Sequence, residues 1–195
     1  ANDEGQGVSY TVTDATVSGT IFFPENLTYG ALTLDSSNDE WVYLLDNSDA
    51  DTQALALNET ATESFAVVVN DGLNTQEQSI SIHVQGANDA PTALALSAAT
   101  VDENVPQAFI GSISVADVDG NDNYTTSLSG IDSDKYEVVG SNLQLKTGVS
   151  ADFETQTTHS LTVTATDVGG QSVSQAVIII VNDVNDAPID INLTF

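Results

Sequence analysis

One segment of the chain occurs twice, and this repeat constrains the fold more than any other feature. Residues 65–91 read FAVVVNDGLNTQEQSISIHVQGANDAP, and residues 161–188 read LTVTATDVGGQSVSQAVIIIVNDVNDAP. Each copy has an alternating segment, a turn in which glycine follows aspartate (Asp71-Gly72 in the first copy, Asp167-Val168-Gly169-Gly170 in the second), a second apolar segment and a final Asn-Asp-Ala-Pro. Self-similarity at domain spacing predicts tandem domains, which we place at residues 1–89 and 90–187. The last residues, 188–195, copy the start of the second domain, so we expect them to begin a following repeat of a longer array.

Both copies have the pattern of β-strands. In residues 79–85 the apolar side chains of Ile80, Ile82 and Val84 alternate with polar ones, and residues 160–166 alternate in the same way. A period of two predicts a half-buried strand. Turn signals recur at short intervals, and residues 48–57 are expected to form at most a short turn of helix. About seven short strands per domain predict an all-β chain of two tandem immunoglobulin-like Greek-key β-sandwiches.

The net charge of the chain is −27, with 29 acidic residues against two lysines, Lys135 and Lys146. So many carboxylates repel one another and destabilise a compact state. A solvated acidic surface, adaptation to high salt and neutralisation by divalent cations all explain this charge. The charge argues against nucleic acid as a partner, because the phosphate backbone would be repelled. No apolar run approaches 18 residues, so direct membrane insertion is not expected.

The sequence lacks two further features, cysteine and a signal peptide. The chain has no cysteine, which excludes disulfides and thiolate metal sites. It begins Ala1-Asn2-Asp3-Glu4 without the pattern of a signal peptide, so we expect it to be an interior piece of a longer protein.

The acidic residues fall in the predicted connections between strands. Calcium takes six to eight oxygen ligands, and alternate loops of a sandwich gather at each end, so acidic loops that are distant in the sequence can meet. Asp-Gly and Asn-Asp are also ordinary turn formers, and any one such motif alone is better explained as a turn.

Five acidic motifs follow one another in the second domain, in this order: Asp102-Glu103-Asn104-x-Pro106, Asp117-Val118-Asp119, Asp152-Phe153-Glu154, Ala165-Thr166-Asp167 and Asp183-Val184-Asn185-Asp186-Ala187-Pro188. The ordered set resembles a cadherin repeat over nearly all of that domain. In the first domain, residues 29–72 resemble the VCBS repeat of giant bacterial surface proteins, such as RTX-type adhesins. The resemblance implies two cadherin-like sandwiches in the extracellular or cell-surface part of a bacterial adhesin, with a role in adhesion or biofilm formation.

The cadherin resemblance also implies Ca²⁺ at the domain junctions. The ligands it implies at the first junction are Glu4, Glu59, Asn88, Asp89, Asp117, Asp119 and Asp167. Those implied at the far end of the second domain are Glu103, Asp152, Glu154, Asp183, Asn185 and Asp186. The Asp-x-Glu motif is not intact in the first domain, where Asp49 and Asp51 are rival ligands, and Asp14 and Asp71 would face a preceding domain. The implied function is a calcium-rigidified extender, with neighbouring repeats of the same chain as partners.

Other functions have weaker support in the sequence. Catalytic triads need a positioned histidine; His83 and His159 are both expected on the polar face of a strand, and we predict that the chain is not an enzyme. Aromatic residues of the first domain, Trp41 and Tyr43 above all, leave open a second function, the binding of a surface polysaccharide or peptide. Core packing is the favoured explanation for both aromatic side chains, since they alternate as on a strand.

Overall fold

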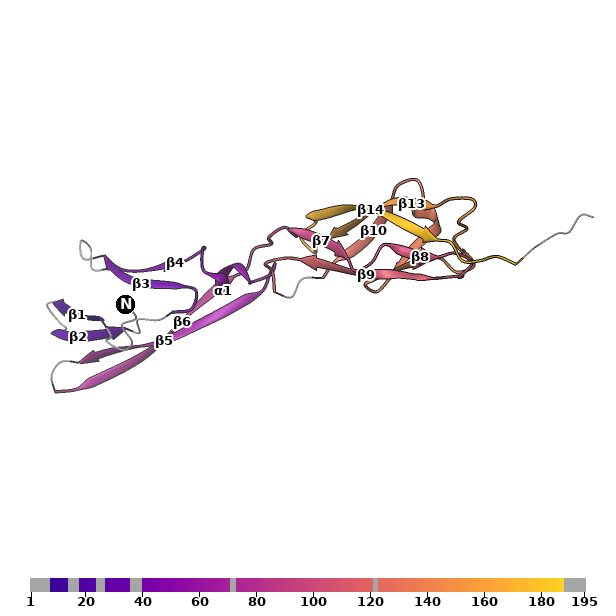
Figure 1. Cartoon of the computed structure of the whole chain (residues 1–195). Coiled ribbons are helices and arrows are strands. Elements are labelled where there is room, and N and C mark those ends of the chain that lie inside the picture. The colour runs from indigo at the N-terminus through magenta and orange to yellow at the C-terminus, as the bar shows by residue number, and fades with distance from the viewer. Residues whose placement is uncertain are drawn as a thin grey trace, which may run out of the picture. The chain divides into compact units, whose positions relative to one another are not determined.

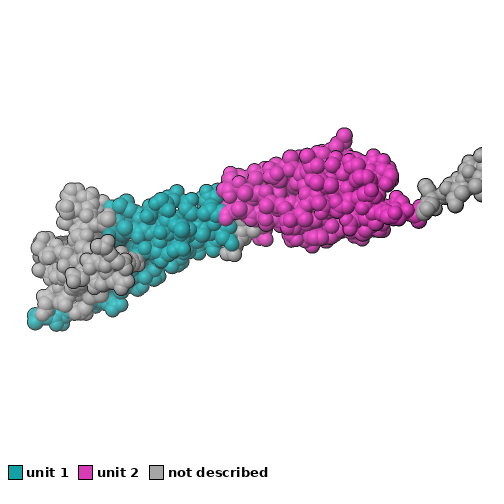
Figure 2. Space-filling view, in the orientation of Figure 1, with its two compact units in different colours: residues 1–89, 118–121 teal, residues 90–117, 122–195 magenta. Residues whose placement is uncertain are grey.

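The computed structural model describes residues 8–13, 18–23, 27–35, 40–70, 73–120 and 123–187. The chain divides into two compact units (Figure 2). Unit 1 comprises residues 1–89 with 118–121, and unit 2 comprises residues 90–117 with 122–195. Residues 118–121 therefore belong to unit 1, although they follow the third strand of the second sequence repeat. The domain boundaries drawn from the sequence remain a prediction.

Unit 1 contains a four-stranded antiparallel sheet and a separate hairpin (Figure 1). The sheet has the order β1 (Val8–Thr13), β2 (Ser18–Phe23), β5 (Thr60–Asn70) and β6 (Thr75–Gln85). The hairpin consists of β3 (Gly30–Asp35) and β4 (Glu40–Leu45). In β5 and β6 the inward residues Phe65 and Val84 are buried, while Ser64 and Ser81 share an outward hydrogen bond of 2.9 Å.

The short turn of helix expected within residues 48–57 is confirmed. Helix α1 spans Ala50–Gln53, and the Asp49 side chain accepts a hydrogen bond from the backbone N–H of Asp51 (2.8 Å). This is the usual way in which an aspartate caps a helix N-terminus. No helix in the described residues is long and apolar enough to cross a membrane.

Unit 2 has two four-stranded sheets, β10-β13-β14-β8 and β11-β12-β9-β7 (Figure 1). Their strands are β7 (Ala93–Leu96), β8 (Thr100–Asp102), β9 (Phe109–Ala116), β10 (Thr125–Ser129), β11 (Tyr136–Val139), β12 (Asn142–Leu145), β13 (Thr158–Thr166) and β14 (Ser172–Asn182). A 3₁₀ turn, η1 (Ser133–Lys135), precedes β11. Because β7 pairs with β9 and β8 pairs in parallel with β14, the consecutive strands β7 and β8 join opposite sheets.

The core of unit 2 lies between these sheets. Its most buried apolar side chains are Val101, Ile110, Tyr136, Leu143, Leu145, Ala151, Leu161, Val163, Ala165, Ile179 and Val181. Most come from alternate positions of a strand, as period-two burial requires. The all-β prediction is confirmed.

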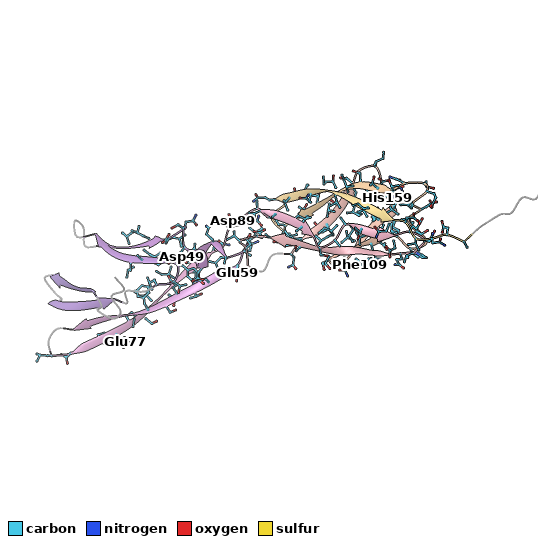
Figure 3. All side chains as sticks on the ribbon, in the orientation of Figure 1. Asp49, Glu59, Glu77, Asp89, Phe109 and His159 are labelled. Atoms are coloured by element: carbon cyan, nitrogen blue, oxygen red, sulfur yellow. The ribbon has the colours of Figure 1, made fainter. Side chains whose placement is uncertain are left out.

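The expected position of His159 was wrong. His159 is only 2% exposed, whereas His83 is exposed as expected. In β13, His159 has the same parity as Leu161 and Val163 and is buried with them. Figure 3 labels the position of His159 in unit 2. The alternation of side chains along β13 sets the direction of the His159 side chain, whereas the polarity of histidine does not.

Candidate metal site

Glu103 is a buried carboxylate at the end of unit 2 where β8 finishes. It follows Asp102, the last residue of β8, and is only 1% exposed. Its Oε1 accepts a hydrogen bond from the backbone N–H of Val184, and its Oε2 accepts one from that of Phe153, both at 2.8 Å. These two donors hold the pKa of Glu103 below its usual value. Because ionised groups are stabilised by such donors, Glu103 is an anion fixed in place by two separate loops.

Two further carboxylates lie beside Glu103. One oxygen from each of Glu103, Asp152 and Glu154 lies within 4.8 Å of the other two. Asp152 is held by Thr155, whose N and Oγ1 each donate a hydrogen bond of 2.8 Å, and these bonds lower the pKa of Asp152.

The electrostatics of Glu154 differ from those of its two neighbours. A backbone hydrogen bond lowers the pKa of Glu154, but partial desolvation and the charges of Glu103 and Asp186 outweigh that effect and raise it. Desolvation and like-charge repulsion both disfavour the ionised form of a carboxyl group, so both raise its pKa. The cluster therefore offers negative charge and oxygen ligands that a cation would stabilise.

The segment 182–186 runs alongside this cluster. Asn104 donates from Nδ2 to Asp186 Oδ1 (2.8 Å), and Asn104 has a left-handed backbone with φ of 61°. Asp183 and Asn185 are exposed on the same segment, and Asn185 Nδ2 donates to the carbonyl of Asp186 at 3.1 Å. The structure thus brings Glu103, Asp152, Glu154 and Asp186 to one end of unit 2, where the cadherin resemblance places them.

The residues expected at the other junction divide between the two units. In unit 1 the backbone N–H of Asp89 donates to Oδ2 of the buried Asp119 (3.0 Å), and Asn88 Nδ2 donates to the carbonyl of Asp89 (2.7 Å). In unit 2, Asp117 accepts from Tyr124 Oη (3.1 Å), and the buried Asp167 accepts from the N–H of Gln171 (2.8 Å). The metal-binding roles of these residues remain a prediction.

The acids considered in the first domain have other positions. Glu59 is exposed and accepts a hydrogen bond from the backbone N–H of Ala56 (3.1 Å). Asp49 caps α1, and Asp51 follows within the same helix. The remaining three, Glu4, Asp14 and Asp71, lie outside the described residues.

Tyr43 makes a polar contact that the sequence analysis missed. Its hydroxyl donates to Oε2 of Glu63 at 2.6 Å, and Glu63 also accepts hydrogen bonds from the backbone N–H groups of Thr28 and Tyr29. Burial and then the bond to Glu63 raise the pKa of Tyr43. Glu63 is buried and has the parity of Phe65 in β5, which was the signal for its direction. Trp41 is in β4 and its side chain lies outside the described part, so ligand binding by these aromatics remains a prediction.

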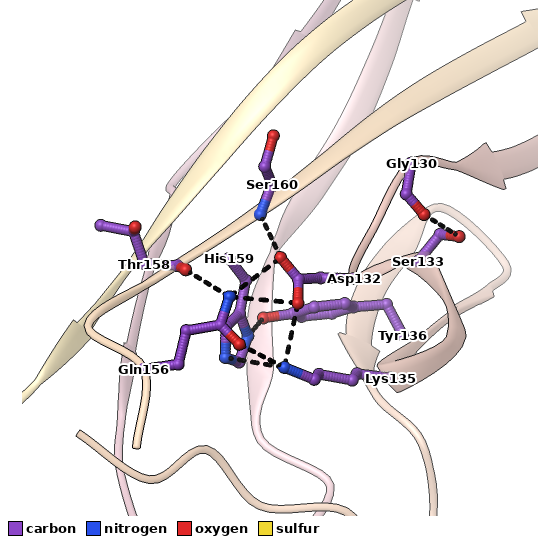
Figure 4. A network of polar contacts seen from close by, with 9 residues as sticks. All are labelled: Gly130, Asp132, Ser133, Lys135, Tyr136, Gln156, Thr158, His159 and Ser160. Carbon is purple, nitrogen blue, oxygen red and sulfur yellow. Dashed lines mark hydrogen bonds and ion pairs between the residues drawn. The ribbon is translucent and has the colours of Figure 1, made fainter. Parts of the chain in front are cut away.

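A second polar network that the sequence did not predict lies inside unit 2 (Figure 4). Asp132 is 5% exposed and accepts hydrogen bonds from Lys135 Nζ (3.0 Å), Gln156 Nε2 (3.1 Å) and the backbone N–H of Ser160 (2.8 Å). His159 Nδ1 lies 2.5 Å from the hydroxyl of Tyr136, and its Nε2 lies 3.5 Å from Lys135 Nζ. Since buried polar groups require partners, this network ties the β10–β11 connection to the start of β13.

Parts of the chain are similar in sequence to known proteins. Residues 97–182 match the sequence model of the Cadherin domain family. The chain is 30% identical over 166 residues to human Protocadherin Fat 1, covering 80% of this chain and 3% of that protein. It is 33% identical over 133 residues to mouse Cadherin-related family member 2, covering 63% of this chain and 10% of that protein. The chain thus spans a small part of both relatives.

Solved structures of protocadherin extracellular regions share the fold. The extracellular domain of Protocadherin GammaB4 superposes with a TM-score of 0.55 at 19% identity, covering 91% of this chain and 30% of that one. The EC3-6 cis-dimer structure of Protocadherin gammaB7 gives 0.56 at 18%, covering 94% and 45%. Human Protocadherin-24 EC1-2 gives 0.53 at 17%, covering 88% and 85%. Residues 97–182 therefore match a cadherin domain in sequence, and the chain has the all-β sandwich fold of cadherin repeats.

Proposed function

We propose that the chain is a non-catalytic extracellular spacer that Ca²⁺ stiffens, and that the cluster of Glu103, Asp152 and Glu154 is one of its calcium sites. The observation that carries the proposal is the meeting of these carboxylates, from two loops separated by about 50 residues. All of them are hard oxygen ligands, which is the type that calcium prefers.

The surroundings of the cluster fit a calcium ion. Glu103 cannot turn away, because its two oxygens are held by Phe153 and Val184. Asp186 lies close enough to raise the pKa of Glu154, so a fourth carboxylate is available. Asp183 and Asn185 are the further ligands that we assign to this site. A bound divalent cation would replace the repulsion among these groups by attraction.

At the other junction we assign Glu4, Glu59, Asn88, Asp89, Asp117, Asp119 and Asp167 as ligands. Calcium there would fix the connection between the domains, and without calcium residues 87–90 would act as a hinge. Neighbouring repeats of the same chain are the partners that this role requires. The resemblance of residues 29–72 to the VCBS repeat supports a bacterial surface adhesin as the parent protein.

The test is a calorimetric melt of the whole chain in chelator and in millimolar calcium. Metal that binds only the folded form raises its stability by mass action, and we expect the melting temperature to rise by roughly 10 °C. A variant with Asp152→Asn and Glu154→Gln should lose much of that rise. Asp134→Asn changes an exposed acid of η1 in the same unit and serves as the control. Identical melts of the parent with and without calcium would refute the proposed function.

A further inference from the structure

The three consecutive residues 102–104 each bind the segment 182–186 at a different point. Asn182 Nδ2 donates to Asp102 Oδ1, the N–H of Val184 donates to Glu103 Oε1, and Asn104 Nδ2 donates to Asp186 Oδ1. All three distances are 2.8 Å. The segment is therefore held along its length by side chains, at every second residue.

These contacts are needed because the β-ladder ends here. The parallel pairing of β8 with β14 stops at the pair Asp102 and Asn182. After it comes one more backbone hydrogen bond, from the N–H of Glu103 to the carbonyl of Asn182 at 3.2 Å. From Asp183 onward the segment is no longer part of the sheet, and Glu103 and Asn104 contact it through their hydrogen bonds with Val184 and Asp186.

The pair Asp102–Asn182 differs from the other two contacts. Glu103 and Asp186 are ligands in the proposed calcium site, whereas Asn182 is neutral and ends β14, and Asp102 is not part of the Glu103, Asp152 and Glu154 cluster. The pair therefore holds the first residue of the segment that carries Asp183, Asn185 and Asp186, and neither member of the pair is needed as a ligand.

We infer that Asp102 and Asn182 are positioning residues, which hold the start of segment 182–186 in its ligating direction before calcium arrives. The inference rests on the proposed function. A segment that is already ordered loses less conformational freedom when its ligands bind a metal, so pre-ordering raises affinity. Both side chains are exposed, so the contribution of this one hydrogen bond is modest, and its loss should weaken calcium binding about 3- to 10-fold.

The main alternative is that the Asp102 carboxylate attracts or binds the ion directly. Substitutions at the pair separate the two roles. Asp102→Asn removes the charge but keeps an Oδ1 acceptor for Asn182, whereas Asp102→Ala removes both. Asn182→Ala breaks the hydrogen bond without changing any charge.

The experiment is a calorimetric calcium titration of the whole chain and these variants, with the Asp152→Asn and Glu154→Gln variant identifying the transition that belongs to this site. We expect Asp102→Ala and Asn182→Ala to lower the calcium affinity of that transition equally, and the double variant to bind calcium no more weakly than either single variant. Asp102→Asn should bind calcium with nearly the affinity of the parent chain. Melts in chelator should be nearly the same for all, because the fold does not depend on the pair.

Three results would overturn the inference. Asp102→Asn binding as weakly as Asp102→Ala would assign the effect to charge. Unchanged calcium affinity in Asp102→Ala and Asn182→Ala would show that the pair has no positioning role, and it would leave the proposed function intact. A parent chain that binds no calcium would refute both the inference and the proposed function.

Discussion

Replacement of the buried Asp132 by alanine should destabilise unit 2 more than replacement of its exposed neighbour Asp134. The buried carboxylate accepts hydrogen bonds from Ser160, Gln156 and Lys135. The Lys135 side chain is 33% exposed, so water can solvate its ammonium group after the change, and its ion pair adds little. The N–H of Ser160 and the amide of Gln156 would each lose a charged acceptor, at about 1.5 kcal/mol apiece. The free energy of unfolding of unit 2 should therefore fall by about 3 kcal/mol.

Differential scanning calorimetry measures this loss directly. For a domain of about 100 residues, 3 kcal/mol corresponds to a decrease in melting temperature of roughly 12–20 °C. Asp134→Ala is the matched control, since Asp134 is an exposed acid on the adjoining η1 turn. Asp132→Asn keeps an acceptor and should fall between the control and the alanine variant. A loss below about 1 kcal/mol, or equal losses for Asp132→Ala and Asp134→Ala, would contradict our interpretation of the network.

Two other predictions concern buried polar groups. Burial, and then the charge of Lys135, lower the pKa of His159 although the Asp132 carboxylate opposes them, so the unfolded chain binds a proton that the folded chain rejects. The stability that neutral His159 contributes is therefore complete above about pH 6.5 and is lost as pH falls toward the pKa of His159 in the folded chain. The free energy of unfolding of His159→Gln, measured with urea, should depend less on pH in this range. The same pH dependence in this variant and in the parent chain would contradict the prediction. Tyr43→Phe removes the hydroxyl donor to Glu63 while keeping the ring, and should lower the stability of unit 1 by about 1–2 kcal/mol. An unchanged melt of unit 1 would show that the hydroxyl contributes nothing.

The strand period explains which parts of the fold could be predicted from the sequence. Leu161 and Val163 are apolar and alternate, so their burial follows from pattern alone. His159 and Glu63 have the same parity as apolar neighbours in their strands and are buried with them. The polarity of His159 nevertheless led us to expect it on the exposed face. In both cases a partner, Tyr136 or Tyr43, satisfies the polar group inside the protein, and no local pattern reveals that partner.

The candidate site could be predicted only in part. The cadherin resemblance of the acidic motifs implied that Glu103, Asp152 and Glu154 serve one site, and the structure brings them together. The contacts of residues 102–104 with 182–186 depend on the register of β8 on β14, which the sequence does not encode locally. The network around Asp132 depends in the same way on the path of the β10–β11 connection.

The central claim is that Glu103, Asp152 and Glu154 bind calcium, and an anomalous difference map from crystals grown in calcium tests it most directly. We predict a peak among the three carboxylates, with oxygen atoms of Glu103, Asp152, Glu154 and Asp186 at about 2.3–2.6 Å from the ion. The claim would be contradicted if crystals grown in millimolar calcium gave no peak at this position while the three carboxylates were well defined in the map.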